Sequence, residues 1–194
     1  MPGPDYPWAT FITGATWADR PKPRTITAVV LHARVVDTPD AIVALRDQRK
    51  LAYHYIALRN GAVLQLVPER GWCHHCGRVL PRSLRDQQTI AICLDGHPHQ
   101  PSWPDEQVLA VSRILSVTFS QHRALPVRSA ASIAVPWGRI PQLDAWPWLE
   151  MHAKVLRLET PIDRIYAAML DDPDQPFPDN GDAYAPYLHI ESEA

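Results

Sequence analysis

Two segments of the chain are apolar and rich in β-branched residues, and they constrain the fold more than any other feature. Residues 26–36 read Ile-Thr-Ala-Val-Val-Leu-His-Ala-Arg-Val-Val, and residues 89–94 read Thr-Ile-Ala-Ile-Cys-Leu. Neither segment alternates between apolar and polar side chains, as a strand with one face in water would. We therefore expect both to be strands of a sheet that is covered on both faces.

The pair Asn60-Gly61 predicts a tight turn between two more strands. Residues 53–59 precede the pair and residues 62–67 follow it. Asn-Gly is preferred in two-residue hairpins because both central residues of the turn take positive φ angles. We therefore expect an antiparallel hairpin here.

Helix signals lie between and after these strands. Residues 40–50 follow Thr38-Pro39 and carry acid early and base late, which complements a helix dipole. Pro104 opens a second helix, whose apolar stripe ends at His122, expected to be a hydrogen-bonded residue at the helix edge. Residues 149–158 and 162–170 also read as helical, and residues 125–130 as a last strand. This pattern predicts an α/β domain with a central mixed sheet flanked by helices.

The first 24 residues form an arm that we expect to lack regular hydrogen-bonded structure. Proline has no backbone N–H, and it interrupts the arm at Pro2, Pro4, Pro7, Pro21 and Pro23. The arm also carries large apolar side chains, namely Trp8, Phe11 and Trp17. We therefore expect it to lie against the domain or against a protein partner.

Beyond the arm we divide the chain into three parts. Residues 25–149 form the domain, residues 150–170 a helical extension, and residues 171–194 an acidic, proline-rich tail. The tail contains no Lys or Arg, which is typical of a solvated, mobile segment. It ends in the apolar residues 184–190, which either a partner or the domain itself would take up as an added strand.

Charge and composition exclude several classes of partner. The net charge is −2, whereas nucleic acid binding calls for a concentrated basic surface. The sequence has no apolar run long enough to cross a membrane, and its first residues lack the features of a signal peptide. We therefore expect cytoplasmic synthesis and neither a nucleic acid nor a membrane partner. The chain has 3 cysteines, an odd number, so a disulfide framework is not expected.

Four segments, in this order, resemble a known enzyme family. They are residues 26–32, residues 52–68 with the motif Ala-Tyr-His-Tyr, residues 72–77 with Trp-Cys-His-His-Cys-Gly, and residues 89–96. Over residues 26–149 the chain resembles the N-acetylmuramoyl-L-alanine amidases, which include phage lysozymes and peptidoglycan recognition proteins. The resemblance implies an α/β fold with a groove for peptidoglycan and a catalytic zinc ion held by three side chains.

By this resemblance, His32 is the first zinc ligand. The second falls within residues 129–136, at Ala131, and the third within residues 137–144, at Pro141. Neither alanine nor proline binds a metal, whereas a catalytic zinc needs about three protein ligands and an open position. The sequence therefore predicts no cofactor, with zinc as the alternative.

Other residues offer unorthodox ligands. A shifted register in the last loop supplies Asp144, and the loop of residues 72–77 supplies Cys73 and Cys76, because Cys-x-x-Cys is half of a structural zinc site. By resemblance, however, this loop lines the substrate groove. The predicted groove residues are His32, Trp72, His74, His75 and Arg139.

Two residues match family positions close to the zinc-bound water. Tyr53 matches a tyrosine that orients this water or the scissile carbonyl, but a phenol is a poor base at neutral pH without zinc. Packing against the sheet is the alternative role of Tyr53. Arg139 replaces a lysine that stabilises the oxyanion, and its guanidinium suits retained binding of a carbonyl or carboxylate.

These observations favour an amidase-fold protein without efficient amidase activity, whose groove binds a muramyl peptide of peptidoglycan. One alternative is an active zinc-dependent amidase that cleaves between the lactyl group of N-acetylmuramic acid and L-alanine. It would use His32, Tyr53 and unorthodox ligands from Cys73 to Cys76 or Asp144. Another is a structural or adaptor subunit of a phage particle or other wall-crossing assembly, held through the arm and the tail. Delivery to the cell wall as part of such an assembly is consistent with synthesis without a signal peptide.

Overall fold

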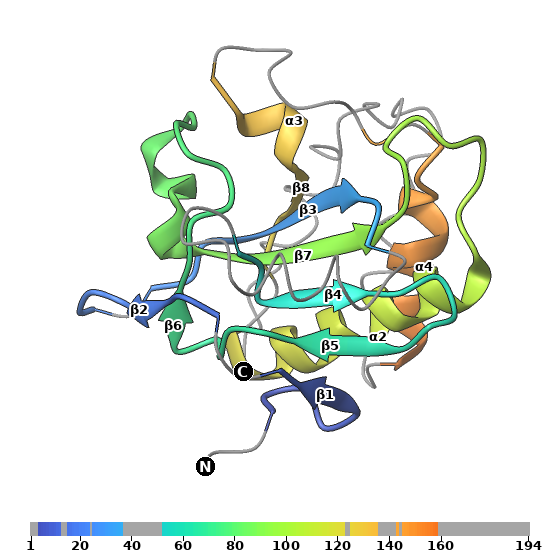
Figure 1. The fold of residues 1–194 in the computed structure, drawn as a ribbon, viewed down its shortest axis with the longest axis horizontal. Coiled ribbons are helices and arrows are strands. Elements are labelled where there is room, and N and C mark those ends of the chain that lie inside the picture. The colour runs from blue at the N-terminus through green and yellow to red at the C-terminus, as the bar shows by residue number, and fades with distance from the viewer. Residues whose placement is uncertain are drawn as a thin grey trace, which may run out of the picture.

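The computed structural model describes residues 4–12, 15–23, 25–36, 52–122, 125–135, 143 and 145–158 (Figure 1). A six-stranded sheet has the strand order β1-β5-β4-β7-β3-β8. Its strands are β1 (Ala9–Phe11), β3 (Ala28–Arg34), β4 (Tyr55–Ala57), β5 (Val63–Gln65), β7 (Thr89–Asp95) and β8 (Val127–Ser129). Two short strands, β2 (Ala18–Asp19) and β6 (Gly71–Trp72), form a separate antiparallel pair. The predicted α/β fold with a central mixed sheet is confirmed.

The centre of the sheet is the pair of strands β3 and β7. They run parallel over their whole length, from Ala28 opposite Thr89 to Arg34 opposite Asp95. Every residue of β7 is buried, as are the first five residues of β3. This confirms the prediction of strands covered on both faces.

The hairpin of β4 and β5 is confirmed. The two strands pair antiparallel, with Tyr55 opposite Gln65. Gly61 in the turn has a φ of 81°, and the side-chain oxygen of Asn60 accepts a hydrogen bond from the N–H of Ala62 at 3.1 Å. A left-handed backbone favours glycine at this position.

One face of the sheet is covered by α2 (Asp105–His122), against which α4 (Trp148–Leu158) packs (Figure 1). The expected stripe of α2 is buried, and His122 ends it with a 2.8 Å hydrogen bond to the Glu69 carboxylate. The hydroxyl of Ser112 joins the two helices by donating to the carbonyl of Met151 at 3.1 Å. Both helices were predicted, whereas the predicted helices of residues 40–50 and 162–170 lie outside the described residues. No helix within the described ranges is both long and apolar enough to cross a bilayer.

The opposite face of the sheet is covered by shorter elements. They are the loop of residues 73–79, the 3-10 turns η1 (Arg82–Leu84) and η2 (Asp86–Gln88), and α3 (Ala130–Ile133). Their apolar side chains meet those of Ala28 and Val30, on the side of β3 that faces away from α2. This layer contains the candidate site.

The arm contains two strands, so the prediction that it lacks regular structure is wrong. β1 adds to the edge of the main sheet by pairing with β5 in parallel, and β2 pairs with β6. The described prolines of the arm, at positions 4, 7, 21 and 23, all lie outside these strands. They therefore remove no hydrogen-bond donor from either ladder. Through these pairings the described part of the arm lies against the domain, one of the two placements expected for it.

Arg20 fixes the arm to the domain. Its guanidinium is buried and donates to the carbonyl oxygens of Glu69 and Gln87, both at 2.7 Å, and of Thr89 at 2.8 Å. Burial lowers the pKa of Arg20 to about 10, so the group is still charged at neutral pH. One side chain therefore satisfies three backbone acceptors that come from different parts of the chain.

We predict that Arg20→Met lowers the free energy of unfolding by about 3 kcal/mol, because it leaves several buried carbonyls without their donor. Urea unfolding of the purified protein measures this loss. The control is Arg70→Met, which removes an exposed arginine whose guanidinium lies 5.6 Å from the ring centre of Trp17. An Arg20 variant no less stable than this control would contradict the role given to the guanidinium.

Candidate functional site

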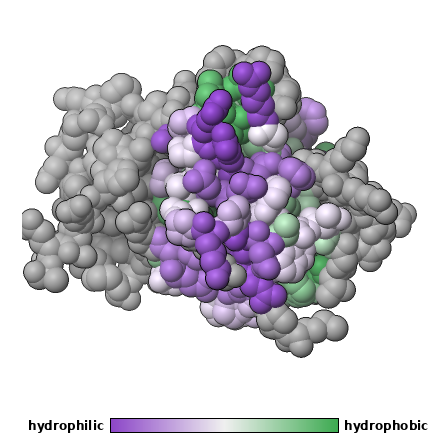
Figure 2. Space-filling model, turned by 90° about the vertical axis from the view of Figure 1, so that its left-hand side faces the viewer, coloured by the Kyte–Doolittle hydropathy of each residue, from purple (hydrophilic) through white to green (hydrophobic). Residues whose placement is uncertain are grey.

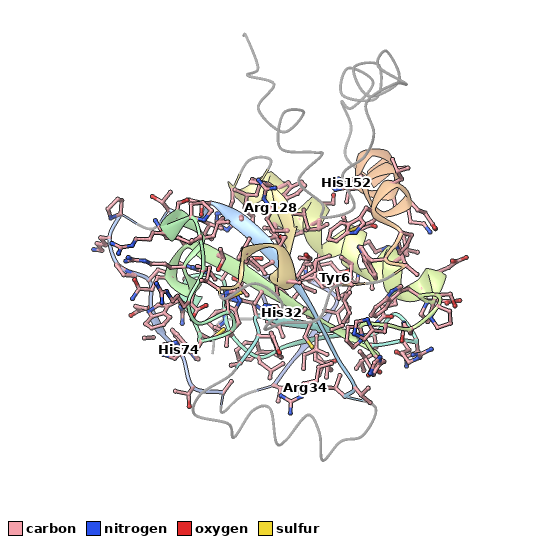
Figure 3. The ribbon with its side chains drawn as sticks, turned by 90° about the horizontal axis from the view of Figure 1, so that it is seen from above. Tyr6, His32, Arg34, His74, Arg128 and His152 are labelled. Carbon is pink, nitrogen blue, oxygen red and sulfur yellow. The ribbon has the colours of Figure 1, made fainter. Side chains whose placement is uncertain are left out.

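His32 lies in the second half of β3, on the face of the sheet opposite α2. Its neighbours Leu31 and Ala33 contact the core formed with α2, and because side chains alternate along a strand, His32 points the other way. It is only 5% exposed. Figure 3 shows His32 near the centre of the molecule and His74 at its edge.

The loop after β6 brings two more metal-binding side chains to His32. Nδ1 of His75 lies 3.0 Å from Nε2 of His32, and Sγ of Cys76 lies 3.6 Å from the same atom. Cys76 Sγ and His75 Nδ1 are 3.0 Å apart. All three residues are buried. Among the described residues they form a group of potential metal ligands whose atoms lie within 4.8 Å of one another.

Hydrogen bonds to η2 and to the start of β7 hold this loop. The N–H of Cys76 donates to Asp86 Oδ1 at 3.0 Å, and Nε2 of His75 lies 2.8 Å from the hydroxyl of Thr89. That hydroxyl donates its single hydrogen to the carbonyl of Arg85 at 3.2 Å. With this hydrogen directed to Arg85, the Thr89 oxygen accepts from Nε2 of His75, the tautomer that leaves a lone pair on Nδ1.

Both imidazoles of the cluster are neutral. Burial lowers the pKa of His32 well below its usual value, and the nearby His75 lowers it further. Burial also lowers the pKa of His75 to about 3, with a smaller contribution from the charge of Arg20. Neutral imidazole is the form that binds metals.

Cys73 takes no part in this cluster. Its thiol donates to the carbonyl of Ala52 at 3.4 Å and lies 3.8 Å from Nδ1 of His54. It packs in an apolar cluster that does not include Cys76. The structure therefore separates the two cysteines of the Cys-x-x-Cys motif, and none of the three cysteines forms a disulfide.

The outer side of the loop borders a pocket of about 580 Å³. Trp72 and His74 line it, and their rings meet edge to face with centroids 5.0 Å apart. Three arginines also line it, namely Arg78, Arg82 and Arg85. The side of the molecule that carries β2, β6 and the 3-10 turns is mostly hydrophilic (Figure 2).

The pocket contains one carboxylate, which is engaged by the loop. Asp86 Oδ2 lies 3.2 Å from His74 Nδ1, and Asp86 Oδ1 accepts the bond from the N–H of Cys76. The basic side chains of the lining outnumber this carboxylate. The pocket therefore suits an anionic ligand.

Comparison with known proteins decides the family. The profile of the N-acetylmuramoyl-L-alanine amidases matches residues 22–146, more than half of the chain. The chain belongs to this family. A search of curated protein sequences finds no match.

Solved structures of amidases share the fold. A selenomethionine derivative of AmpD matches with a TM-score of 0.64 and 16% identity over 76% of this chain and 94% of that chain. The amidase LysC from Clostridium intestinale URNW matches with a TM-score of 0.57 and 18% identity over 75% of this chain and 97% of that chain. The Ph2119 endolysin from a Thermus scotoductus MAT2119 bacteriophage matches with a TM-score of 0.56 and 16% identity, over 75% and 99%. At such identities the likeness concerns the fold alone.

The zinc set that the amidase family implies does not fit the described residues of this chain. Ser129 of β8 lies opposite Leu31, so the chain enters α3 beside the end of β3 that carries His32. Ala131, the position matched to the second ligand, is a buried alanine of α3. Arg139, Pro141 and Asp144 lie outside the described residues. We therefore derive no catalytic step through this set.

Tyr53 is close to His32 but buried. The two ring centroids are 5.1 Å apart, and Tyr53 packs in the apolar cluster that contains Cys73 and Cys93. Burial raises the pKa of its phenol, so the group is neutral at physiological pH. This environment favours packing against the sheet over a role as a base.

His32 and the loop of residues 73–76 were both predicted as sources of metal ligands, and the structure brings His75 and Cys76, but not Cys73, to His32. The supporting residues Asp86 and Thr89, which lie in a turn and at the start of a strand, were not predicted. No sequence signal marks Asp86, because it stands in the polar run of residues 85–88. The hydrogen bond from the N–H of Cys76 shows that Asp86 supports the loop.

We predict that none of the three cysteines reacts with iodoacetamide at neutral pH while the protein is folded. All are buried, and burial raises the pKa of Cys73 and that of Cys93, the latter to about 12. Thiolate is the reactive form. Mass spectrometry should find no modified cysteine in the native protein and three after unfolding in urea. Rapid modification of the native protein would contradict the buried positions.

Proposed function

We propose that this amidase-family protein binds muramyl peptides of peptidoglycan without cleaving them. The observation that carries the proposal is Ala131, a buried residue of α3 that cannot bind a metal and that the resemblance matches to the second zinc ligand. In this proposal the amidase fold still provides a groove for a fragment of peptidoglycan, although the set of zinc ligands is incomplete. Arg139 contributes to this binding in the proposal, as a donor to a carbonyl or carboxylate.

The basic pocket supports this proposal. Peptide stems of peptidoglycan carry carboxylates, which Arg82 and Arg85 can bind as planar, paired hydrogen-bond donors. Trp72 offers an aromatic surface for the apolar parts of the peptide or the sugar. The loop that holds Trp72 is also the one that lines the substrate groove in the resemblance to the family.

An active zinc amidase is the second candidate, favoured by the close approach of His32, His75 and Cys76. Three protein ligands are the number that a catalytic zinc uses. Catalysis also needs an open position for water and substrate, whereas these three residues are at most 5% exposed. We therefore rank binding above turnover.

We predict that Trp72→Ala and Arg82→Ala each weaken binding of an N-acetylmuramyl peptide at least about tenfold. The measurement is isothermal titration calorimetry, and melting temperatures should stay nearly unchanged because Arg82 is exposed and Trp72 only half-buried. The matched controls are Trp8→Ala, a 72% exposed tryptophan, and Arg59→Ala in the hairpin turn. Neither control lines the pocket.

The parent protein should also release no peptide from purified muropeptides during prolonged incubation with added zinc. Chromatography of the products detects any free peptide that begins with L-alanine. Such release would establish the second candidate instead. A parent protein that binds no muropeptide would refute the binding proposal.

A further inference from the structure

We propose that His32, His75 and Cys76 bind one divalent transition-metal ion of the zinc class, which joins the loop of residues 73–77 to β3. This site differs from the family's set, since it keeps the first histidine and takes its other two ligands from another loop. It goes beyond peptide binding, because the metal here supports the layer of the fold behind the pocket. The site requires neither amidase activity nor the pocket's ligand.

The spacing of the three atoms matches a tetrahedral zinc site. With Zn–N of about 2.0 Å and Zn–S of about 2.3 Å, two nitrogen ligands lie about 3.3 Å apart, and a nitrogen and a sulfur about 3.5 Å apart. His32 Nε2 and His75 Nδ1 are 3.0 Å apart, and Cys76 Sγ lies 3.6 Å from His32 Nε2. The remaining pair, Cys76 and His75, is 3.0 Å apart and needs to separate by about half an ångström.

The three candidate ligand atoms lie close together. Nδ1 of His75 is 3.0 Å from Nε2 of His32 and 3.0 Å from Sγ of Cys76. A metal ion bound to a Cys76 thiolate would use one lone pair from each of the three residues.

The groups around the cluster are arranged like those that orient the ligands of a metal site. Histidine ligands usually donate their other ring N–H to an oxygen, which fixes the tautomer. His75 does so toward Thr89, and Asp86 Oδ1 lies 3.5 Å from the same nitrogen. Asp86 also accepts the backbone N–H of Cys76. Each of the two loop ligands is thus positioned by the pair of Asp86 and Thr89.

The donor set selects the class of metal. Two imidazole nitrogens and a thiolate suit zinc or cobalt, whereas magnesium and calcium prefer oxygen ligands. Burial of all three residues encloses the ion. Zinc-class binding should therefore stabilise the folded chain, since the ligands come together only when it folds.

Cobalt binding to the reduced protein tests the site. A thiolate-to-cobalt charge-transfer band in the near ultraviolet should appear and saturate at one equivalent, and zinc should displace it. Cys76→Ser should lose the band and bind at least about a hundredfold more weakly. Cys73→Ser is the matched control, as it removes a buried thiol of the same loop that lies outside the cluster, and it should retain the band.

A second measurement uses the unchanged protein, so it does not depend on whether a variant folds. Removal of metal with a chelator should lower the melting temperature, and zinc but not magnesium should restore it. The proposal is overturned if the parent protein takes up neither zinc nor cobalt, or if Cys76→Ser retains the charge-transfer band. Muropeptide binding is scored separately, so failure of the metal site and failure of the proposed function are distinguishable.

Discussion

The parallel pairing of β3 with β7 is the constraint on which the rest of the structure depends. Both strands are apolar throughout and buried, so each face of the sheet must be covered. On one face, the stripe of apolar side chains on α2 covers the strands. On the other face the cover consists of a loop, two 3-10 turns and the short α3. This irregular layer lies directly over His32, which explains why its side chain is buried.

Much of this fold could be predicted from local sequence because its signals are local. The unbroken apolar strands, the Asn60-Gly61 turn and the start of α2 at Pro104 each depend on neighbouring residues alone. The strands of the arm could not be predicted in this way. β1 and β2 consist of a few residues each and exist because distant partners, β5 and β6, offer a free edge. The prolines of the arm do not indicate whether the residues between them form strands.

The types of residue in the candidate site could be predicted from the sequence, but not which of them come together in the fold. Cys73 and Cys76 share a motif, yet the loop turns between them and directs their thiols to different neighbours, Ala52 for one and the two histidines for the other. The partner of Cys76 is 44 residues earlier in the chain. No spacing rule connects them, because the connection depends on how the loop lies across β3. The supporting atoms of Asp86 and Thr89 follow from the same packing.

The bonds of Arg20 also determine when the molecule can become complete. Its three carbonyl acceptors lie 49, 67 and 69 residues farther along the chain. During synthesis from the N-terminus, the arm therefore cannot reach its final place until residues up to Thr89 have left the ribosome. The arm is thereby fastened to the stretch that carries the loop of residues 73–77 and ends at Thr89. The position of the arm and the position of the loop thus depend on the same part of the chain.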